Sequence, residues 1–150
     1  MNALNEQIPG AETRQDVLVM IPRINIHAFC VDSRTGQAVQ AAAADRRMSK
    51  AHVQVQTGGI PAAAETYSQS ETPNVLIVES QGNRDGVLAE LAQLAAVCEP
   101  STRVIVIGHL NDVLLYRELT RLGISDYLVA PVTSIQLIQS VGALFSDPQG

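Results

Sequence analysis

Few residues of this 150-residue chain combine the type and the spacing that catalysis needs. Cys30 with His27 or His109 could supply a nucleophile and a base, because a thiol needs a neighbouring base to become a reactive thiolate. Nothing in the order of these residues along the chain supports that pairing. Cys30 and Cys98 each lie in an apolar stretch, HAFCV and AAVCE, without CxxC spacing. We therefore expect two buried thiols that neither bind metal nor catalyse.

The composition points to a packed α/β domain. Hydrophobic residues make up 46% of the chain and aromatic residues only 3%, so Val, Ile, Leu and Ala must build the core. The formal net charge of -5 argues against the basic surface that phosphate backbones require, so nucleic acid is not an expected partner. No apolar run approaches the ~18 residues of a membrane span, and the N-terminus lacks a leader pattern. We expect a cytoplasmic chain without a membrane span.

We expect one domain, over residues 16–146, because chains of about 100–200 residues usually form a single core. Residues 1–15 are polar, contain Pro9 and Gly10 and show no period, which predicts a disordered lead-in. The run DVLVMI at 16–21 is an extra or competing strand, which Pro22 ends. Residues 147–150 are interpreted as the start of a linker or an artificial chain end.

Along the domain, short β-branched runs alternate with segments of helical period, a pattern typical of βα units around a parallel sheet. The predicted strands are 24–31, 52–56, 74–79, 103–107 and 127–129. The predicted helices are 35–47, 60–68, 85–97, 112–122 and a last helix that begins at Ser134. NVLIVE and RVIVI are continuous and apolar, which predicts central strands, whereas HVQVQ alternates and predicts a strand near an edge.

The apolar periods of the helices predict which faces are buried. In the helix over 112–122, Asp112 is the expected cap and Gly123 the expected stop. The buried stripe of that helix is expected to hold Leu115, Leu119 and Leu122. The stripe of the helix over 85–97 is expected to hold Val87, Leu88, Leu91, Leu94, Ala95 and Cys98. The stripe of the last helix is expected to hold Ile135, Leu137, Ile138, Val141, Leu144 and Phe145.

Five βα units of this length match a flavodoxin-like three-layer sandwich, with a five-stranded parallel sheet in the order 2-1-3-4-5. Its functional crevice lies at the C-terminal ends of strands one, three and four, although the fold alone does not fix a function. A nucleotide or flavin site in this crevice would need a glycine-rich loop. The pair Gly58 and Gly59 precedes the helix over 60–68, away from the expected switch point, which disfavours such a site.

Three motifs resemble those of response-regulator receiver domains, and the resemblance covers 24–145. They are PNVLIVE at 73–79, RDG at 84–86 and LGISDYLVAP at 122–131. The last is similar to the receiver pattern Leu-Gly-Ala-x-Asp-Tyr-Leu-x-Lys-Pro. The resemblance implies a CheY-like fold with a crevice that binds Mg²⁺ and in which an Asp accepts a phosphoryl group. A Lys and a hydroxyl side chain then stabilise the charge of that phosphoryl group.

This chain departs from the receiver pattern at nearly every functional position. Glu79 occupies the phosphoacceptor position, and its extra methylene moves the carboxylate by about 1.5 Å, enough to slow a reaction steeply. Ala130 replaces the Lys, and Gly108, followed by His109, replaces the hydroxyl residue. Of the acidic pair after strand one only Asp32 remains, which makes a weak cation site. We expect a pseudo-receiver without catalytic residues, metal or cofactor, in which Glu79 either mimics a phosphorylated state or accepts hydrogen bonds from nearby N–H groups.

The histidines have their own alternatives. His27 is expected to be a structural residue, hydrogen-bonded in the surroundings of the sheet. His109 lies in the crevice loop, where a neutral imidazole could contact a ligand or titrate near neutral pH, and the alternative is an exposed loop histidine.

The runs IHAFCV, AAAADRRM and NDVLLYRELTRLGISDYLVAPV, with the GGI turn, are similar to the N-terminal atypical receiver of the CpaE/TadZ family of Flp pilus assembly proteins. In that family a MinD/ParA-like ATPase domain follows, and the protein helps to place the pilus machinery at a cell pole. This chain has no GxxxxGK[ST] motif, so the resemblance implies that any ATPase activity lies beyond Gly150.

A partner face is expected on the helix over 112–122, the strand over 127–129 and the last helix, the surface that receivers commonly use. Val113 and Tyr116 stand apart from the leucine stripe, where a monomer would normally carry charge, and Tyr127 is assigned to the same face. We therefore expect a non-enzymatic interaction or localisation module that forms a homodimer or binds another protein. The alternatives are a working phosphoacceptor that uses Asp32 or Glu79, and a nucleotide or cofactor binder.

Overall fold

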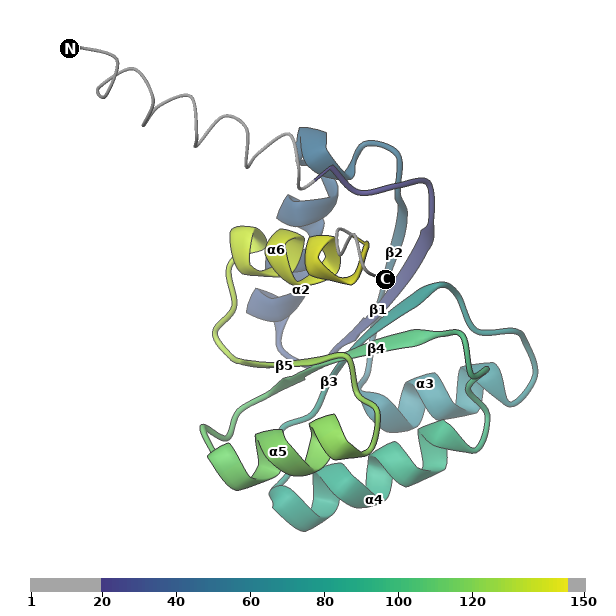
Figure 1. Ribbon diagram of the computed structural model, residues 1–150, viewed down its shortest axis with the longest axis vertical. Helices are drawn as coiled ribbons and strands as arrows, with labels where there is room; N and C mark the ends of the chain where they lie inside the picture. The colour runs from purple at the N-terminus through teal and green to yellow at the C-terminus, as the bar shows by residue number, and fades with distance from the viewer. Residues whose placement is uncertain (1–19, 146–150) are drawn as a thin grey trace, which may run out of the picture.

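A parallel sheet of five strands forms the middle layer of the protein (Figure 1). The structure, a computed structural model, describes residues 20–145. Its strands are β1 (Asn25–Cys30), β2 (His52–Thr57), β3 (Val75–Glu79), β4 (Arg103–Gly108) and β5 (Asp126–Val129). They lie in the order β2-β1-β3-β4-β5, which confirms the predicted topology. The predicted lead-in over 1–15, most of the run at 16–21 and residues 147–150 lie outside the described residues.

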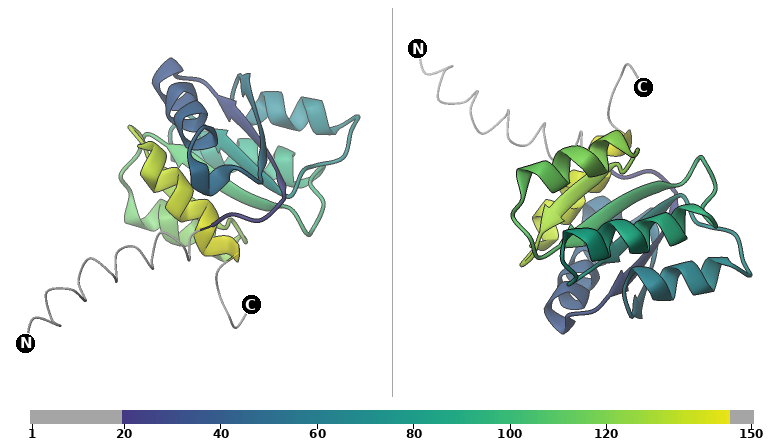
Figure 2. Two further views of the ribbon diagram at one scale, coloured as in Figure 1. Left: turned by 90° about the horizontal axis from the view of Figure 1, so that it is seen from above. Right: turned by 90° about the horizontal axis from the view of Figure 1, so that it is seen from below.

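Helices cover both faces of the sheet, as Figure 2 shows from two sides. The helices are α2 (Ser33–Ala43), the short 3-10 helix η1 (Arg46–Met48), α3 (Ile60–Tyr67), α4 (Arg84–Ala95), α5 (Val113–Arg121) and α6 (Ser134–Phe145). Helices α2 and α6 lie on one face, and α3, α4 and α5 lie on the other. This is the three-layer arrangement that the βα pattern predicts.

The two central strands carry the core on both faces. Val75 and Ile77 point toward the layer of α2 and α6, whereas Leu76 and Val78 point toward the layer of α3, α4 and α5. All of β3 is buried, and so is most of β4. By contrast, β2 at the sheet edge is exposed or half-buried along its length. The contrast between continuous and alternating sequence runs therefore predicted the strand positions correctly.

Helix α2 differs from the prediction of a helix over 35–47. It begins at Ser33, because the side chain of Asp32 accepts a hydrogen bond from the backbone N–H of Arg34 at 2.8 Å. It ends at Ala43, where Asp45 caps a new turn by accepting the N–H of Arg47 at 2.9 Å. A second cap so close to the first helix divides the segment into two helices.

Four residues assigned to buried stripes are exposed. Leu122 is the C-cap residue of α5 and is 63% exposed, because the chain leaves the helix there. Ile135 is 50% exposed, since its position in the helical period points it away from Leu137 and Val141. Phe145 ends α6 at the rim of the core, where the guanidinium of Arg103 lies over its ring, and Ala95 ends α4 in solvent.

Gly123 ends α5 as predicted. Its φ is +98°, and its N–H bonds to the carbonyl of Thr120 while that of Ile124 bonds to the carbonyl of Leu119. This pair of bonds is a Schellman motif, which favours glycine because L side chains are strained at positive φ. Of the two thiols that were predicted to be buried, Cys30 is buried but Cys98 only half-buried. Within residues 20–145, no helix has the length and apolar character to cross a membrane.

Candidate functional site

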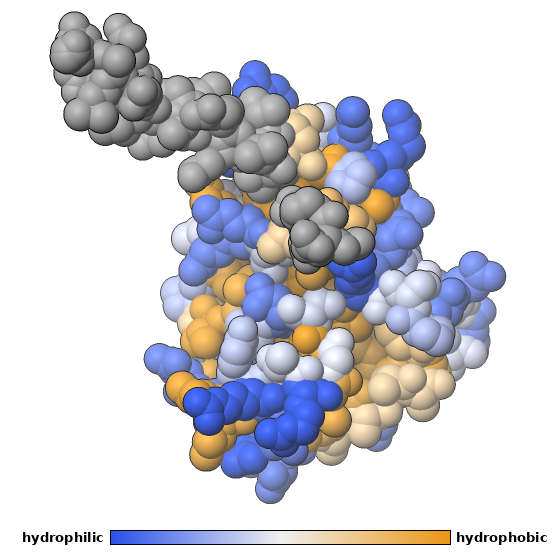
Figure 3. Space-filling view, viewed as in Figure 1, coloured by the Kyte–Doolittle hydropathy of each residue, from blue (hydrophilic) through white to orange (hydrophobic). Residues whose placement is uncertain are grey.

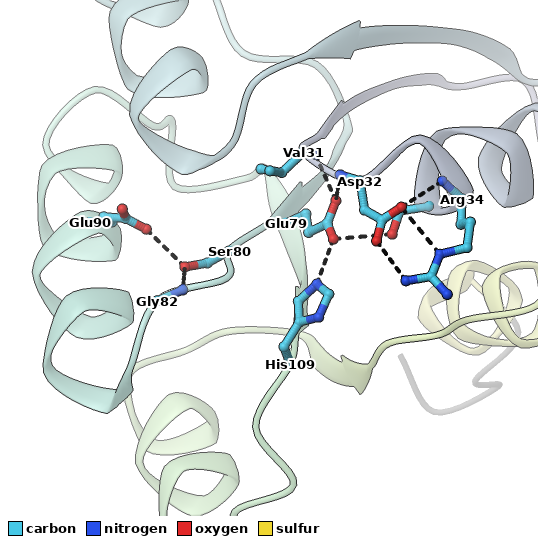
Figure 4. Close-up of polar contacts among 9 residues, drawn as sticks. Val31, Asp32, Arg34, Glu79, Ser80, Gly82, Glu90 and His109 are labelled. Atoms are coloured by element: carbon cyan, nitrogen blue, oxygen red, sulfur yellow. Dashed lines mark hydrogen bonds and ion pairs between the residues drawn. The ribbon is translucent and has the colours of Figure 1, made fainter.

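The candidate site lies at the C-terminal ends of β1, β3 and β4. Asp32 follows β1, Glu79 is the last residue of β3, and His109 follows β4. Because these strands are neighbours and parallel, their ends meet at one edge of the sheet. The structure thus brings together the acidic and imidazole side chains that the sequence assigned to a degenerate receiver pocket (Figure 4).

Glu79 lies at the centre of this cluster and its side chain is 0% exposed. Its Oε1 accepts the backbone N–H groups of Val31 at 2.6 Å and Asp32 at 2.9 Å. Its Oε2 accepts the hydroxyl of Thr35 at 3.1 Å and lies 2.7 Å from Nε2 of His109. Both carboxylate oxygens of Glu79 have hydrogen-bond partners. Of the two alternatives, a mimic of a phosphorylated state and a carboxylate that accepts hydrogen bonds from nearby N–H groups, the structure therefore favours the second.

His109 closes the outer side of Glu79 (Figure 4). Its side chain is 29% exposed, which places the imidazole between the buried carboxylate and solvent. A carboxylate oxygen accepts hydrogen bonds, so Nε2 of His109 is the donor in this contact. His109 is an exposed loop residue, as the alternative expected, but its ring is also held by a buried acid.

Asp32 serves the local structure of α2. Its carboxylate caps the helix and also pairs with the guanidinium of Arg34 at 3.0 Å. These bonds to Arg34 hold the pKa of Asp32 below its ordinary value. The carboxylate that remains of the receiver acidic pair is thus already bound to a cation of its own chain.

The cluster does not fit a divalent cation. Both oxygens of Glu79 have donors, Asp32 is paired with Arg34, and Val31 offers no oxygen in its side chain. Magnesium needs one or two free carboxylates with several waters. In the part of the chain that the structure describes, no group of three or more His, Cys, Asp or Glu residues could hold a metal ion.

Gly108 occupies the position at which receivers carry a hydroxyl side chain, and the ring of Tyr127 fills the space beside it. A Cβ at position 108 would lie 2.3 Å from the hydroxyl oxygen of Tyr127 and 2.6 Å from its ring. That hydroxyl donates a hydrogen bond to the carbonyl of Leu110 at 2.7 Å. Glycine is therefore what allows the tyrosine ring to enter the protein at this point.

The cavity beside the cluster is small. Its volume is about 60 Å³, and its lining residues are Asp32, Arg34, Thr35, His109, Ala130, Pro131 and Val132. Sites for nucleotide-sized ligands usually measure about 300 Å³ or more. Ala130 forms part of the wall and places a methyl group where a receiver would have an ammonium group.

Gly59 lies closer to the site than the sequence predicted. A Cβ at this residue would meet the carbonyl oxygen of Glu79 at 2.7 Å and Val31 at 3.0 Å. The Gly58–Gly59 turn is therefore packed against the C-terminal ends of β1 and β3. The prediction that this turn lies away from the switch point was wrong. The tight contact with backbone explains the glycine.

The predicted partner face is exposed in part. Val113 is 63% and Tyr116 is 47% exposed on α5, and apolar side chains appear among charged ones at the α5 end of the molecule in Figure 3. Tyr127 was also assigned to this face, but it is only 7% exposed and packs in the core under α5. The assignment of Tyr127 was wrong because the missing side chain of Gly108 lets the ring turn inward.

Sequence reasoning missed several residues of the site. Thr35 lies in the first turn of α2, one helical turn after Asp32, and this spacing was the available signal. Ser80 follows Glu79 and donates to Glu90 at 3.0 Å while accepting the N–H of Gly82 at 3.1 Å. This second cluster holds the loop between β3 and α4 in place (Figure 4).

His27 was predicted to be a structural residue. Its Nδ1 atom lies 2.5 Å from the hydroxyl oxygen of Tyr67.

No family model and no curated protein matches the chain. Solved structures do. The crystal structure of the pilus assembly protein CpaE from Caulobacter crescentus is 47% identical, covers 85% of this chain and 97% of that chain, and has a TM-score of 0.83. A CpaE2 pilus assembly protein from Sinorhizobium meliloti is 40% identical, covers 81% of this chain and 99% of that chain, and has a TM-score of 0.78.

More distant structures share the fold. A response regulator from Thermotoga maritima is 18% identical over 85% of this chain and 99% of that chain, with a TM-score of 0.61. At this identity the likeness concerns the fold, which is that of CheY-like receiver domains. With the CpaE identities of 40% and 47%, these comparisons show that the chain belongs to the CpaE family of pilus assembly proteins and has a receiver-like, flavodoxin-like fold.

Proposed function

We propose that this chain is a non-catalytic receiver-like module that binds protein partners and thereby localises or regulates a pilus assembly protein. The observation that carries the proposal is the state of Glu79. Its carboxylate is 0% exposed, and four donors surround its two oxygens. An acid in this state serves as a structural hub that joins β1, α2, β3 and the loop after β4.

Phosphoryl transfer would require the carboxylate to approach a phosphoryl donor in line, with cations to stabilise the transferred charge. The imidazole of His109 stands between Glu79 and solvent. Ala130 supplies no cation, and Gly108 supplies no hydroxyl. The Asp, the Lys and the hydroxyl of a receiver are thus each replaced here, and the carboxylate at the phosphoacceptor position is buried.

The two alternative functions have less support. Asp32 is the other possible phosphoacceptor, but its carboxylate is engaged by the backbone and the guanidinium of Arg34. A nucleotide or cofactor in the crevice would need several times the observed cavity of about 60 Å³. We therefore rank the interaction module first, the phosphoacceptor second and the cofactor binder third.

The proposed partners follow from the family and from the surface. The resemblance to CpaE/TadZ proteins suggests a MinD/ParA-like ATPase domain as the effector that this module regulates, acting in the cytoplasm at a cell pole. The proposed docking face comprises α5, β5 and α6 and carries the exposed residues Val113 and Tyr116. A homodimer through the same face is the second arrangement that this surface would serve.

A phosphorylation assay tests the proposal. The chain is incubated with acetyl phosphate and Mg²⁺ beside a receiver known to accept phosphoryl groups, and intact mass is measured. We expect an adduct on the control receiver and none on this chain. We also expect beryllium fluoride with Mg²⁺ to leave its amide spectrum unchanged.

A matched variant sharpens the assay. Glu79→Asp restores the receiver residue but leaves Gly108 and Ala130 in place, so we expect it to stay unmodified as well. An acid-labile adduct on Asp32 or Glu79 of the wild-type chain would overturn the proposal and favour the working phosphoacceptor.

A further inference from the structure

The strand β2 leaves one edge of the sheet open. It comes first in the order β2-β1-β3-β4-β5, and in the described part of the chain only β1 pairs with it. The N–H groups of His52 and Gly58 donate to carbonyl groups on the β1 side, at 2.8 and 3.0 Å. Because successive residues of a strand point their backbone groups to opposite sides, those of Val53, Val55 and Thr57 point away from the sheet.

This edge lacks the features that usually protect an edge strand, which are short length, charged side chains and proline. The strand β2 runs over six residues, HVQVQT, and none of them is Asp, Glu, Lys, Arg or Pro. The opposite edge is protected, because β5 has only four residues, begins with Asp126 and is soon followed by Pro131. The two edges of one sheet therefore differ, and β2 is the edge that can accept another strand.

The surroundings of β2 are free of charge, although 17% of the chain is charged. No Asp, Glu, Lys or Arg occurs between Arg34 and Asp45 or between Lys50 and Glu65. These two segments hold β2 and all but the first two residues of α2, which packs beside it. In a symmetric pair each residue near the axis meets its own copy, so a charge there would repel itself. A surface without charge thus favours a second copy of this chain over a charged molecule.

We propose that β2 pairs with β2 of a second copy of the chain, antiparallel and with the two-fold axis at Gln54. In this register Val53 lies opposite Val55 of the second copy, so the outward backbone groups of the two strands meet. The pairing uses the whole of β2 up to the turn at Gly58. It also joins the half-buried valines of the two copies, which pack on the α2 face of each sheet. Two five-stranded sheets thereby become one continuous sheet.

The pair leaves both docking faces accessible, since β5 lies at the opposite edge of the sheet from β2 (Figure 1). A pair of six-residue strands is a small contact beside the roughly 1,200 Å² of stable interfaces, so the association of the chain alone is weak. Any second contact that holds two copies together raises their effective concentration and strengthens the pair. The inference goes beyond the proposed function and does not depend on it.

Cysteine cross-linking tests the register. Gln54→Cys puts two thiols on the axis, where the Cα atoms of facing residues lie about 4.5 Å apart, within the range of a disulfide. Gln56→Cys is the matched control on the same exposed side of β2, because its two copies would lie more than about 10 Å apart. Both variants carry Cys98→Ser, since Cys98 is half-buried whereas Cys30 is buried. On mild oxidation we expect at least about tenfold more disulfide dimer from Gln54→Cys than from Gln56→Cys.

An exchange of charge tests the same contact without oxidation. Gln54→Lys and Gln54→Glu each bring like charges together at the axis, so each should weaken self-association at least about fivefold in analytical ultracentrifugation. An equal mixture of the two variants should regain association, because opposite charges then face each other. Gln93→Lys makes the same change at an exposed residue of α4 and should leave association unaltered. Residue 54 is exposed, so the thermal melts should stay near that of the wild type.

Two results would overturn the proposal. One is equal cross-linking of Gln54→Cys and Gln56→Cys, which would also follow if another segment of the chain covered this edge. The other is a mixture of Gln54→Lys with Gln54→Glu that associates no more than either variant alone. Both measurements act at β2, so they distinguish this contact from association through α5. Their failure is also separate from failure of the proposed function, which the phosphorylation assay tests.

Discussion

The Nε2 atom of His109 lies 2.7 Å from Oε2 of Glu79, so that a side chain from the end of β4 closes off the acid at the end of β3. In a working receiver the corresponding carboxylate must meet a phosphoryl donor from solution. Here the imidazole occupies that approach, and Glu79 faces only donors of its own chain. In related folds this crevice supports chemistry. Here Glu79 connects β3 by hydrogen bonds to the end of β1, to α2 and to the loop after β4.

Removal of this carboxylate should destabilise the protein without exposing any apolar core. Glu79→Ala leaves two backbone N–H groups, the hydroxyl of Thr35 and the imidazole of His109 without their acceptor. Each buried group left unpaired costs about 1–3 kcal/mol, with some relief from water. We expect a loss of about 3 kcal/mol or more in the free energy of unfolding, measured by urea denaturation.

Glu79→Gln serves as the control because it keeps the size of the side chain. Its amide oxygen accepts the two backbone N–H groups, whereas its NH₂ group faces donors, so we expect an intermediate loss of stability. If Glu79→Ala were as stable as the wild type, the carboxylate would not be the structural hub that we describe.

The two cysteines should react slowly in the folded protein. Burial, with a smaller contribution from Glu79, raises the pKa of the Cys30 thiol to about 12. Burial also raises the pKa of Cys98. Since the thiolate is the reactive form, alkylation of Cys30 at pH 8 should be at least about tenfold slower than in urea, and its rate should still rise above pH 9. Peptide mass spectrometry after timed alkylation measures each site, and rapid labelling of native Cys30 would refute its burial.

The core strands can be tested with an inward charge. Ile77→Asp in β3 or Ile105→Asp in β4 would bury an unpaired carboxylate, which costs several kcal/mol in a domain whose total stability is about 5–15 kcal/mol. We expect these variants to be unfolded by circular dichroism. The control is Ile135→Asp on α6, where the side chain is 50% exposed and the change should be tolerated. Cooperative folding of Ile77→Asp would mean that β3 is not a central strand.

The docking face can be tested by association. Val113→Glu with Tyr116→Ala changes two exposed residues of α5, so the thermal melt at low concentration should stay nearly the same. An aromatic anchor at an interface commonly contributes about 2 kcal/mol or more, roughly thirtyfold in dissociation constant. Analytical ultracentrifugation should therefore show a shift toward monomer.

Ala92→Glu, an exposed change on α4, controls for added negative charge and should leave the association unaltered. If the wild-type chain is monomeric at high concentration, self-association through α5 is wrong. Docking of another domain or of another protein would then be the remaining use of this face.

The sequence by itself predicted the elements and the order of the sheet. Continuous apolar runs such as NVLIVE differ from the alternating HVQVQ, and this local contrast separates central strands from an edge strand. It also brought Asp32, Glu79 and His109 to one edge, because the ends of neighbouring parallel strands must meet. Helix ends were less predictable, because Asp32 caps α2 ahead of the segment predicted over 35–47, and Asp45 caps a second helix within it.

Only the tertiary structure decided what these residues do there. Whether Glu79 reaches solvent depends on which donors bond to its two oxygens, and those come from the residues after β1, from α2 and from the loop after β4. The inward position of Tyr127 depends on the empty space beside Gly108, one strand away. Periodicity and capping act within a few residues along the chain, whereas these contacts depend on strand register and side-chain packing between elements that are 17 to 48 positions apart in sequence.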